Sequence, residues 1–315
     1  MLNRLWMTRL AAFAVLCVVV GLPALADGHA AHEKKEITHS VFIAGPKFTG
    51  IVGEDGKPTW AAPHKGARDG YVLDSGNVLI AYAKDVFEYD KDKQVVWTYK
   101  LHKSNGEIST AQRLENGNTL ITELGKNPRL LEVAKDGSIK VEVKLQPETD
   151  NVHMQTRMAR KLENGNYIVP HLFAFAVKEY APDGKVVQEF PTDTEHFGGR
   201  DTKHWPFTAI RTPEGTTVVG CTYGNRVVEF DKDGKIIWEL TNDDVGGIIK
   251  DACGVQRLPN GNTVVTSYGQ RAAGKVKMFE VTKDKKVVWQ TTTFPAHHFQ
   301  VLTTNGKPIE GNTMK

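Results

Sequence analysis

The stretch Leu258–Asn262, which reads Leu-Pro-Asn-Gly-Asn, recurs along the chain and decides its fold. Close copies begin at Leu73, Leu114 and Leu162, and a degenerate copy, Thr-Pro-Glu-Gly-Thr, begins at Thr212. Each copy stands between runs of β-branched residues. Asn-Gly dipeptides in that setting indicate tight hairpins, because Asn and Gly accept the positive φ that such turns need. The chain is therefore an array of β-hairpin units.

Each unit continues in the same way after its first turn. An apolar run, an alternating run and an Asp-Gly-Lys turn follow, as in Arg226–Asp231 and then Gly234–Trp238. Each unit therefore predicts a four-stranded antiparallel meander. A period of about 45 residues with four strands is typical of a propeller blade, whereas helical repeats would show a hydrophobic period of 3.6. The sequence predicts an all-β fold, a β-propeller.

The two ends of the repeat region are incomplete units of complementary kinds. Ser40–Ile43, Thr49–Val52 and Gly56–Trp60 supply the second, third and fourth strands of a blade that lacks a first strand. Phe299–Gly306 supplies a first strand and its turn. Joining the two closes the ring and leaves no open sheet edge. We predict six blades, with one blade shared between the N- and C-terminal parts of a single domain over residues 39–315.

The first residues have the three-part form of a secretory signal peptide. Arg4 and Arg9 flank a basic region, Leu10–Leu22 is apolar, and Ala24–Ala26 is a small-x-small cleavage site. We predict a signal peptide over residues 1–26 and a flexible leader over residues 27–38. The apolar run is short for a bilayer span, so no membrane span is expected after cleavage; a retained anchor is the alternative. The expected location is the bacterial periplasm or the medium.

The charge balance argues against nucleic-acid binding. The 315 residues include 40 Lys and Arg against 37 Asp and Glu, a formal net charge of +3. No basic cluster interleaved with aromatic residues stands out. The expected partner is a small polar or anionic molecule, or another exported protein.

The blade registers bring polar residues to one end of the propeller axis. His64 and His153 lie thirteen residues before the last Asn of their turns, and His204 lies twelve before Thr216. These positions precede inner strands, and His298 precedes the final inner strand. Convergent polar groups from several blades are expected of a binding or catalytic site, although a water-filled channel would also be polar.

Two further registers extend this set. Arg68 and Arg157 lie nine residues before the turn Asn, and Glu123 and His171 lie five after it. The predicted ligand-binding residues are His64, Arg68, Glu123, His153, Arg157, His171, His204 and His298. Among them, the candidate nucleophiles or general bases are His153, His204 and His298. No pair with the spacing of metal ligands is present, so no metal site is predicted.

Cys221 and Cys253 occupy registers of similar height in consecutive blades. In an exported protein such a pair is a disulfide candidate. Two buried thiols are the alternative, and a catalytic thiol is a third reading.

The ends of the repeats resemble those of known propellers. Asp233–Trp238, with its variants Asp183–Gln188 and Asp284–Trp289, resembles the blade motif of pyrroloquinoline-quinone enzymes. Together with Leu-Pro-Asn-Gly-Asn-Thr, the whole unit is similar to bacterial six-bladed propellers related to arylsulfotransferases. That resemblance implies a nucleophilic histidine near the axis, assisted by other histidines and an arginine. The eight blades and adjacent-cysteine disulfide of the quinoprotein dehydrogenases are missing, so the sequence names no cofactor.

Three functions follow from this reading. The first is an exported propeller that binds a small polar or anionic ligand in a funnel lined by His and Arg, without necessarily catalysing a reaction. The second is a periplasmic transferase or hydrolase, similar to arylsulfotransferases, that uses an axial histidine. The third is a scaffold for protein–protein interaction. Propellers host all three, so the fold alone does not decide whether the protein is an enzyme.

Overall fold

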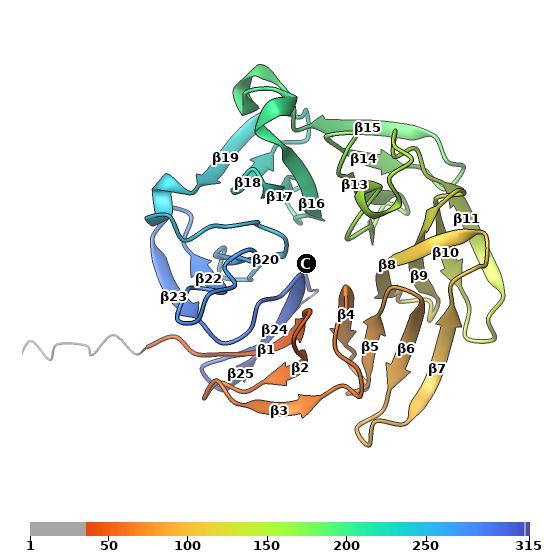
Figure 1. Cartoon of the computed structure of the whole chain (residues 1–315), viewed down its shortest axis with the longest axis horizontal. Coiled ribbons are helices and arrows are strands. Elements are labelled where there is room, and N and C mark those ends of the chain that lie inside the picture. Colours follow the sequence, from red (N-terminus) through yellow and green to blue (C-terminus); the bar gives the residue numbers. More distant parts are fainter. Residues whose placement is uncertain (1–35, 312) are drawn as a thin grey trace, which may run out of the picture. The chain divides into compact units, whose positions relative to one another are not determined.

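Six antiparallel β-sheets surround a common axis in this protein (Figure 1). The structure, a computed structural model, describes residues 36–311 and 313–315. The predicted signal peptide and most of the leader lie outside these residues. The six sheets confirm the predicted six-bladed β-propeller. Within the described part of the chain, no helix has the length and apolar character needed to cross a membrane.

Five blades follow the order of the chain, each with its first strand nearest the axis (Figure 1). The first blade contains β4 (Asp69–Val72), β5 (Val78–Ala81), β6 (Asp85–Tyr89) and β7 (Val95–Lys100). The second contains β8 (Asn105–Arg113), β9 (Thr119–Gly125), β10 (Arg129–Val133) and β11 (Ile139–Lys144). The third contains β12 (Arg160–Lys161), β13 (Tyr167–His171), β14 (Ala176–Tyr180) and β15 (Val186–Pro191).

The fourth and fifth blades complete this series. They contain β16 (His204–Arg211), β17 (Thr217–Tyr223), β18 (Arg226–Phe230) and β19 (Ile236–Thr241), then β20 (Val255–Arg257), β21 (Thr263–Thr266), β22 (Met278–Val281) and β23 (Val287–Thr291). Short 3-10 helices lie in the connections between blades: η1 (Val152–Met154), η2 (Glu195–Phe197), η3 (Arg200–Thr202) and η4 (Asp243–Val245).

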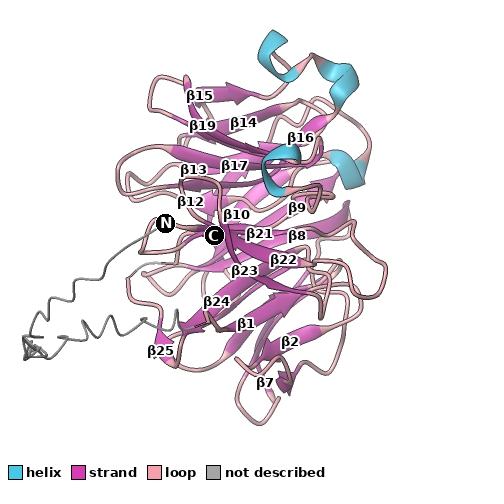
Figure 2. Cartoon of the chain, turned by 90° about the vertical axis from the view of Figure 1, so that its left-hand side faces the viewer, coloured by secondary structure: helices cyan, strands magenta, loops and turns pink. Residues whose placement is uncertain are grey.

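The closing blade joins strands from both ends of the described chain. Its order is β25-β24-β1-β2-β3, with the bounds β1 (His39–Ala44), β2 (Thr49–Val52), β3 (Pro58–Ala61), β24 (His298–Thr304) and β25 (Lys307–Pro308). β24 lies beside β1 (Figure 2). The two strands pair antiparallel, with Val41 opposite Val301. This pairing confirms the predicted shared blade. The short β25, which adds a fifth strand beside β24, was not predicted.

The repeated turns take the conformation that their sequence predicts. Gly117, Gly165 and Gly261, the glycines of three Asn-Gly turns, have φ of 84°, 87° and 84°. A side chain would be strained in this left-handed region, which explains why glycine recurs there. The turns set the strand register and so direct one face of each sheet toward the neighbouring blade.

Apolar residues of adjacent blades form the core. Leu79 of β5 and Ile121 of β9 are fully buried in one cluster that also contains Trp97 of β7. Similar clusters lie between the other blades. Burial is therefore spread over the sheet-to-sheet contacts of the ring.

One carboxylate per junction, buried at four of the five, ties each of five blades to the next. We call these the junction carboxylates; they lie on the third strands and are Glu88, Glu132, Glu179, Glu229 and Glu280. Each accepts a hydrogen bond from the last turn residue of its own blade, such as Asn166 on Glu179 at 2.7 Å. Each also faces a basic residue of the following blade: Arg113, Lys161, Arg211, Arg257 and His39, respectively. The turn Asn therefore recurs because its side chain holds this carboxylate.

Candidate functional site

Five charged or titratable residues meet at one end of the axis, and we call them the rim cluster. Arg68 directly precedes β4, Glu107 is the third residue of β8, and His153 and Arg157 precede β12. His297 directly precedes β24. All five therefore stand near the entry of an inner strand, which is why four separate segments bring them to the same end of the ring.

Glu107 is the centre of the polar side of the rim cluster. Its Oε2 accepts a hydrogen bond from Nη1 of Arg68 and lies 3.2 Å from Nδ1 of His153. Burial opposes ionisation of Glu107, but the hydrogen bonds from His153 and Arg68 outweigh it and hold its pKa well below the ordinary value. The carboxylate is thus ionised at neutral pH. It orients an imidazole whose side chain is 61% exposed, the arrangement of a general base and its orienting acid.

Arg157 is a buried cation beside this pair. Its guanidinium donates to the carbonyl oxygens of Thr156, at 2.7 Å, and of His153. No ion pair to Arg157 occurs among the described residues. Burial and the nearby charge of Arg68 lower its pKa to about 10, so it stays charged at neutral pH. The charge of nearby Glu107 acts in the opposite direction, but Glu107 is paired with Arg68 and His153 and makes no ion pair with Arg157. A buried charge without a directly paired counter-ion is costly, and an anionic ligand would offset that cost.

Aromatic rings form the other side of the rim. The guanidinium of Arg157 lies 5.8 Å from the ring of Phe207, and Tyr268 stacks on His297 with ring centroids 4.2 Å apart. Trp205 packs at 5.1 Å from Phe173 in the same apolar cluster. Such faces bind planar or apolar groups.

Two buried polar atoms on this side have no hydrogen-bond partner within the described structure: Nδ1 of His297 and Nε1 of Trp205. Buried polar atoms are nearly always satisfied, so these two are candidates for contact with a ligand. Burial, and then the charge of Arg157, lowers the pKa of His297 to about 3. The imidazole is therefore neutral at neutral pH.

A second group, the axial cluster, fills the axis further along the inner strands. Asp69 accepts a hydrogen bond from Arg160 at 2.9 Å, and its Oδ1 lies 3.9 Å from Nζ of Lys315. Nδ1 of His298 lies 3.2 Å from the same Nζ, and the lysine Nζ stands 3.5 Å from the ring centre of Tyr71. His298, a predicted catalytic residue, is 0% exposed and belongs to this buried network. It does not lie at an accessible surface.

The predicted site residues fall into two groups. Arg68, His153 and Arg157 come together in the rim cluster, as the register count predicts. Glu123 does not, because its carboxylate accepts hydrogen bonds from Tyr99 and Arg129 between blades.

Three predicted histidines also lie outside the rim cluster. His171 is fully buried, with Nε2 2.9 Å from the hydroxyl of Tyr180. His204 bonds to Thr202 at 2.8 Å. His64 is exposed and packs edge-on against Tyr82. Residues at the ends of second strands face neighbouring blades, so counting forward from the turn did not find axial positions.

Sequence reasoning missed Glu107, the acid that orients His153. A strand alternates its faces with a period of two, so the registers nine, eleven and thirteen residues before the turn share one face. The sequence analysis used only the registers nine and thirteen residues before the turn. Glu107 and Trp205 both lie eleven residues before the last residue of their turns. Completing the alternation would have found both residues.

Cys221 and Cys253 are both free thiols in this structure. Cys221 belongs to the apolar cluster around β17, whereas Cys253 faces Phe207 and lies 3.5 Å from Oγ1 of Thr222. Burial raises the pKa of each thiol to about 12. Of the readings left open by the sequence, the structure has the two buried thiols and not the disulfide candidate, and neither sulfur has the thiolate character of a nucleophile.

Replacing His171 with Gln should flatten the dependence of stability on acid pH. Burial, then the charge of Lys178, lowers the pKa of His171 to about 3 in the folded state. In the unfolded chain His171 has an ordinary pKa near 6.5, so on acidification the unfolded state binds the proton first. The free energy of unfolding therefore keeps the full contribution of His171 above about pH 6.5 and falls below that pH. We expect protonation of His171 in the unfolded chain to lower the free energy of unfolding by about 3 kcal/mol at pH 4.5. Urea titrations at several pH values measure the free energy of unfolding of both proteins. If it fell equally with decreasing pH in the wild type and in His171→Gln, the prediction would be contradicted.

Fold and site together define a six-bladed β-propeller with a charged and aromatic rim at one end of its axis. Residues 47–252 match the family described as Mal s 1 allergenic protein-like. The chain belongs to this family. No curated protein matches the chain.

Solved structures share the fold at low sequence identity. A protein of unknown function from Bacteroides caccae aligns with a TM-score of 0.72 and 20% identity, over 87% of this chain and 100% of that one. A catalytically inactive virginiamycin B lyase from Staphylococcus aureus, crystallised with quinupristin, gives 0.57 and 16%, over 83% and 86%. A luciferin-regenerating enzyme gives 0.56 and 13%, over 82% and 92%. Likeness at this identity shows the fold only.

Proposed function

We propose that the rim cluster binds a small molecule that carries an anionic group on a planar or apolar body. The observation that carries this proposal is Arg157, a buried cation with only carbonyl oxygens as partners, beside the rings of Phe207 and His297. An anion would pair with the guanidinium while its body lies against the rings. In the exported protein that the sequence predicts, this is a periplasmic or secreted binding function.

Replacing Arg157 with Met should weaken the binding of aryl anions by about tenfold to a hundredfold, the value of a charge-assisted hydrogen bond. The probes are benzoate, phenyl phosphate and phenyl sulfate, with benzamide as the neutral isostere of benzoate, and calorimetry measures the affinity. Removing the charge but not the volume isolates the electrostatic contribution.

Two variants serve as controls for that experiment. Arg200 also lies over a ring, that of Phe175, but is paired with Asp193 at 2.8 Å; Arg200→Met should leave binding unchanged. His204→Ala should also leave it unchanged, since His204 faces Thr202. Failure of all three anions to bind, or equal affinity in Arg157→Met, would contradict the proposal.

A second candidate function is hydrolysis or transfer at the same place, favoured by the His153–Glu107 pair. His153 would act as the base or nucleophile, Glu107 would orient it, and Arg157 would hold the anionic ester, as the resemblance to arylsulfotransferases implies. Release of nitrophenolate from 4-nitrophenyl sulfate or phosphate tests it. Activity lost in His153→Ala and lowered in Glu107→Gln would support the enzyme; binding without turnover would support the binding protein.

A further inference from the structure

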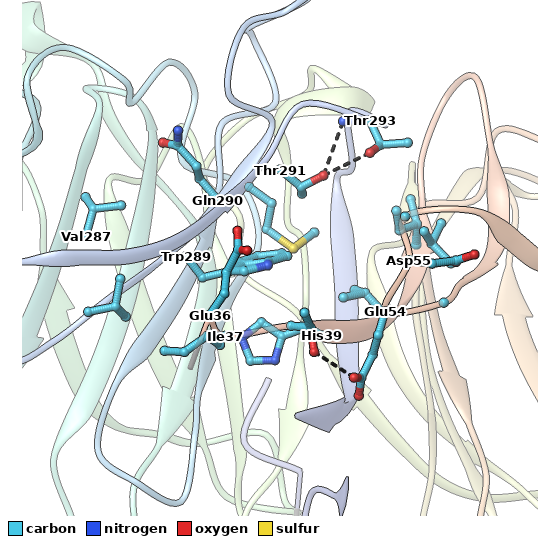
Figure 3. Close-up of a pocket in the computed structure, with 18 residues that line it drawn as sticks. Glu36, Ile37, His39, Glu54, Asp55, Val287, Trp289, Gln290, Thr291 and Thr293 are labelled. Carbon is cyan, nitrogen blue, oxygen red and sulfur yellow. Dashed lines mark hydrogen bonds between the residues drawn. The ribbon is translucent and has the colours of Figure 1, made fainter. Parts of the chain in front are cut away.

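A groove of about 570 Å³ lies where the fifth blade meets the closing blade (Figure 3). None of its lining residues belongs to the rim cluster. Trp289 of β23 and Glu36 line one side, and Glu54 and Asp55 of the turn between β2 and β3 line the other. Its size is that of a small-molecule site. The repeated architecture allows this junction to be compared with its equivalents.

At three other junctions a side chain of the outer strand is bonded to the next blade. Nε1 of Trp97 donates to the carbonyl oxygen of Lys135 at 3.1 Å, and Nε1 of Trp238 donates to that of Lys283 at 2.8 Å. Gln188 makes the same contact with Lys232 at 2.7 Å. Each acceptor is the residue before the Asp of a third-to-fourth-strand turn.

The fifth junction departs from this pattern twice. No hydrogen bond among the described residues joins the indole of Trp289 to the equivalent turn, and both line the groove. The turn residue that is lysine in the three other blades is here Glu54. The outer-strand side chain and the turn of the next blade are therefore not hydrogen-bonded at this junction. The turn carries a negative charge where the three other turns carry a positive one.

The charged lining of the groove is acidic. Its members are Glu36, Glu54, Asp55 and His39, with no Lys or Arg. His39 is already engaged, since its Nε2 lies 2.7 Å from the buried Glu280. Its ring also packs edge-on against Trp289 at 4.7 Å.

Glu54 is a carboxylate held in place by neutral donors. Its Oε2 accepts from Thr38 at 2.7 Å, and its Oε1 accepts from Thr303 and from the amide of Gly306. These hydrogen bonds lower its pKa, and no cation is paired with it in the described part of the chain. The side chain is thus fixed and ionised, with acceptor capacity left on Oε2.

The floor of the groove is apolar. It is formed by Val41, Ile43, Val52 and Met278, together with the half-buried ring of Trp289. An apolar floor with an aromatic ring and an anionic rim suits a cation on a hydrocarbon body, because ring faces and carboxylates both attract positive charge.

We propose that this groove binds a small organic cation: an ammonium, amidinium or guanidinium group on an apolar body, with the charge at Glu54 and Glu36 and the body against Trp289. A second groove of about 550 Å³, along β19, shows the contrast. It is lined by Lys235 as well as Glu239, so its charges do not favour a cation. The proposed site is independent of the function proposed for the rim.

The test uses three probes that share one ring and differ in charge: benzamidine, benzamide and benzoate. Calorimetry on the wild-type protein should show benzamidine binding about tenfold or more tightly than benzamide. Arg157→Met, which should weaken benzoate at the rim, should leave benzamidine binding unchanged. Equal affinity for benzamidine and benzamide would overturn the proposal.

Matched variants locate the site. Glu54→Lys installs the residue found at the equivalent turns, and it should reduce benzamidine affinity at least tenfold. Trp289→Leu should reduce it as well, whereas Trp238→Leu, at the equivalent bonded position, should not. Glu36→Gln, an exposed change that leaves the bonds of Glu54 in place, keeps the test valid if Glu54→Lys fails to fold. If Glu36→Gln and Trp289→Leu both bound benzamidine with the affinity of the wild-type protein, benzamidine would bind elsewhere and the proposal would be overturned.

Discussion

A chain truncated before His298 is expected to lose the cooperative melting transition of the propeller. The truncation removes β24, the strand that pairs with β1 and closes the ring. Phe299 and Val301, both buried, leave the core with it. Loss of one large buried side chain costs about 3–5 kcal/mol, and an exposed inner sheet edge is added to that. The sum is comparable with the total stability of a domain, about 5–15 kcal/mol.

Calorimetry and near-UV circular dichroism measure this effect. Truncation after Gly306 is the matched control, because it removes β25 and the contacts of Lys315 but keeps β24. That control should melt cooperatively at a lowered temperature. A normal melt of the chain truncated before His298 would show that the other five blades are stable without the closing strand.

Replacing Asp69 with Leu is expected to destabilise the protein by about 3–5 kcal/mol, the cost of removing one partner of a buried ion pair. Asp69 is fully buried and is the carboxylate partner of Arg160 and Lys315. Burial already lowers the pKa of Lys315 well below its ordinary value, so the lysine can release its proton. The guanidinium of Arg160 cannot, and it would be left charged in the interior.

Urea denaturation measures the loss, and a double variant tests its cause. Asp69→Leu combined with Arg160→Met removes both charges, so it should be more stable than Asp69→Leu alone. If the double variant were as unstable as the single one or worse, lost packing around Asp69, and not an uncompensated charge, would be the cause.

The repeat predicted the architecture because every blade carries the same local signals. The Asn-Gly turns, such as the one at Gly117, fix hairpins through their own backbone conformation, independently of distant parts of the chain. The closing blade followed from two incomplete units, which only one pairing can complete. Local signals thus determined blade number and ring closure.

The site was less predictable because it depends on distant contacts. The register count found Arg68, His153 and Arg157, but it missed Glu107 because the register eleven residues before the turn was not counted. The contact of Lys315 with Asp69 of β4 joins residues far apart in the sequence, and no repeated motif specifies it. The contacts of side chains near the axis depend on the space that remains there once all six blades have formed the ring.

The junction carboxylates also define how such a chain could gain or lose a blade. Glu179 is held by Asn166 of its own blade and by Arg211 of the next. A duplicated segment that ran from the first strand of one blade to the first strand of the next would carry one basic residue and one junction carboxylate. At each new junction, the carboxylate of one blade would therefore meet a basic residue of the following blade. Duplication in that phase preserves the ion pair of each junction carboxylate that it copies. The blade is therefore a self-matching unit of gene duplication. The closing blade departs from it on both sides: it offers His39 of β1 to the fifth blade, and among the described residues it makes no such carboxylate pair with the first blade.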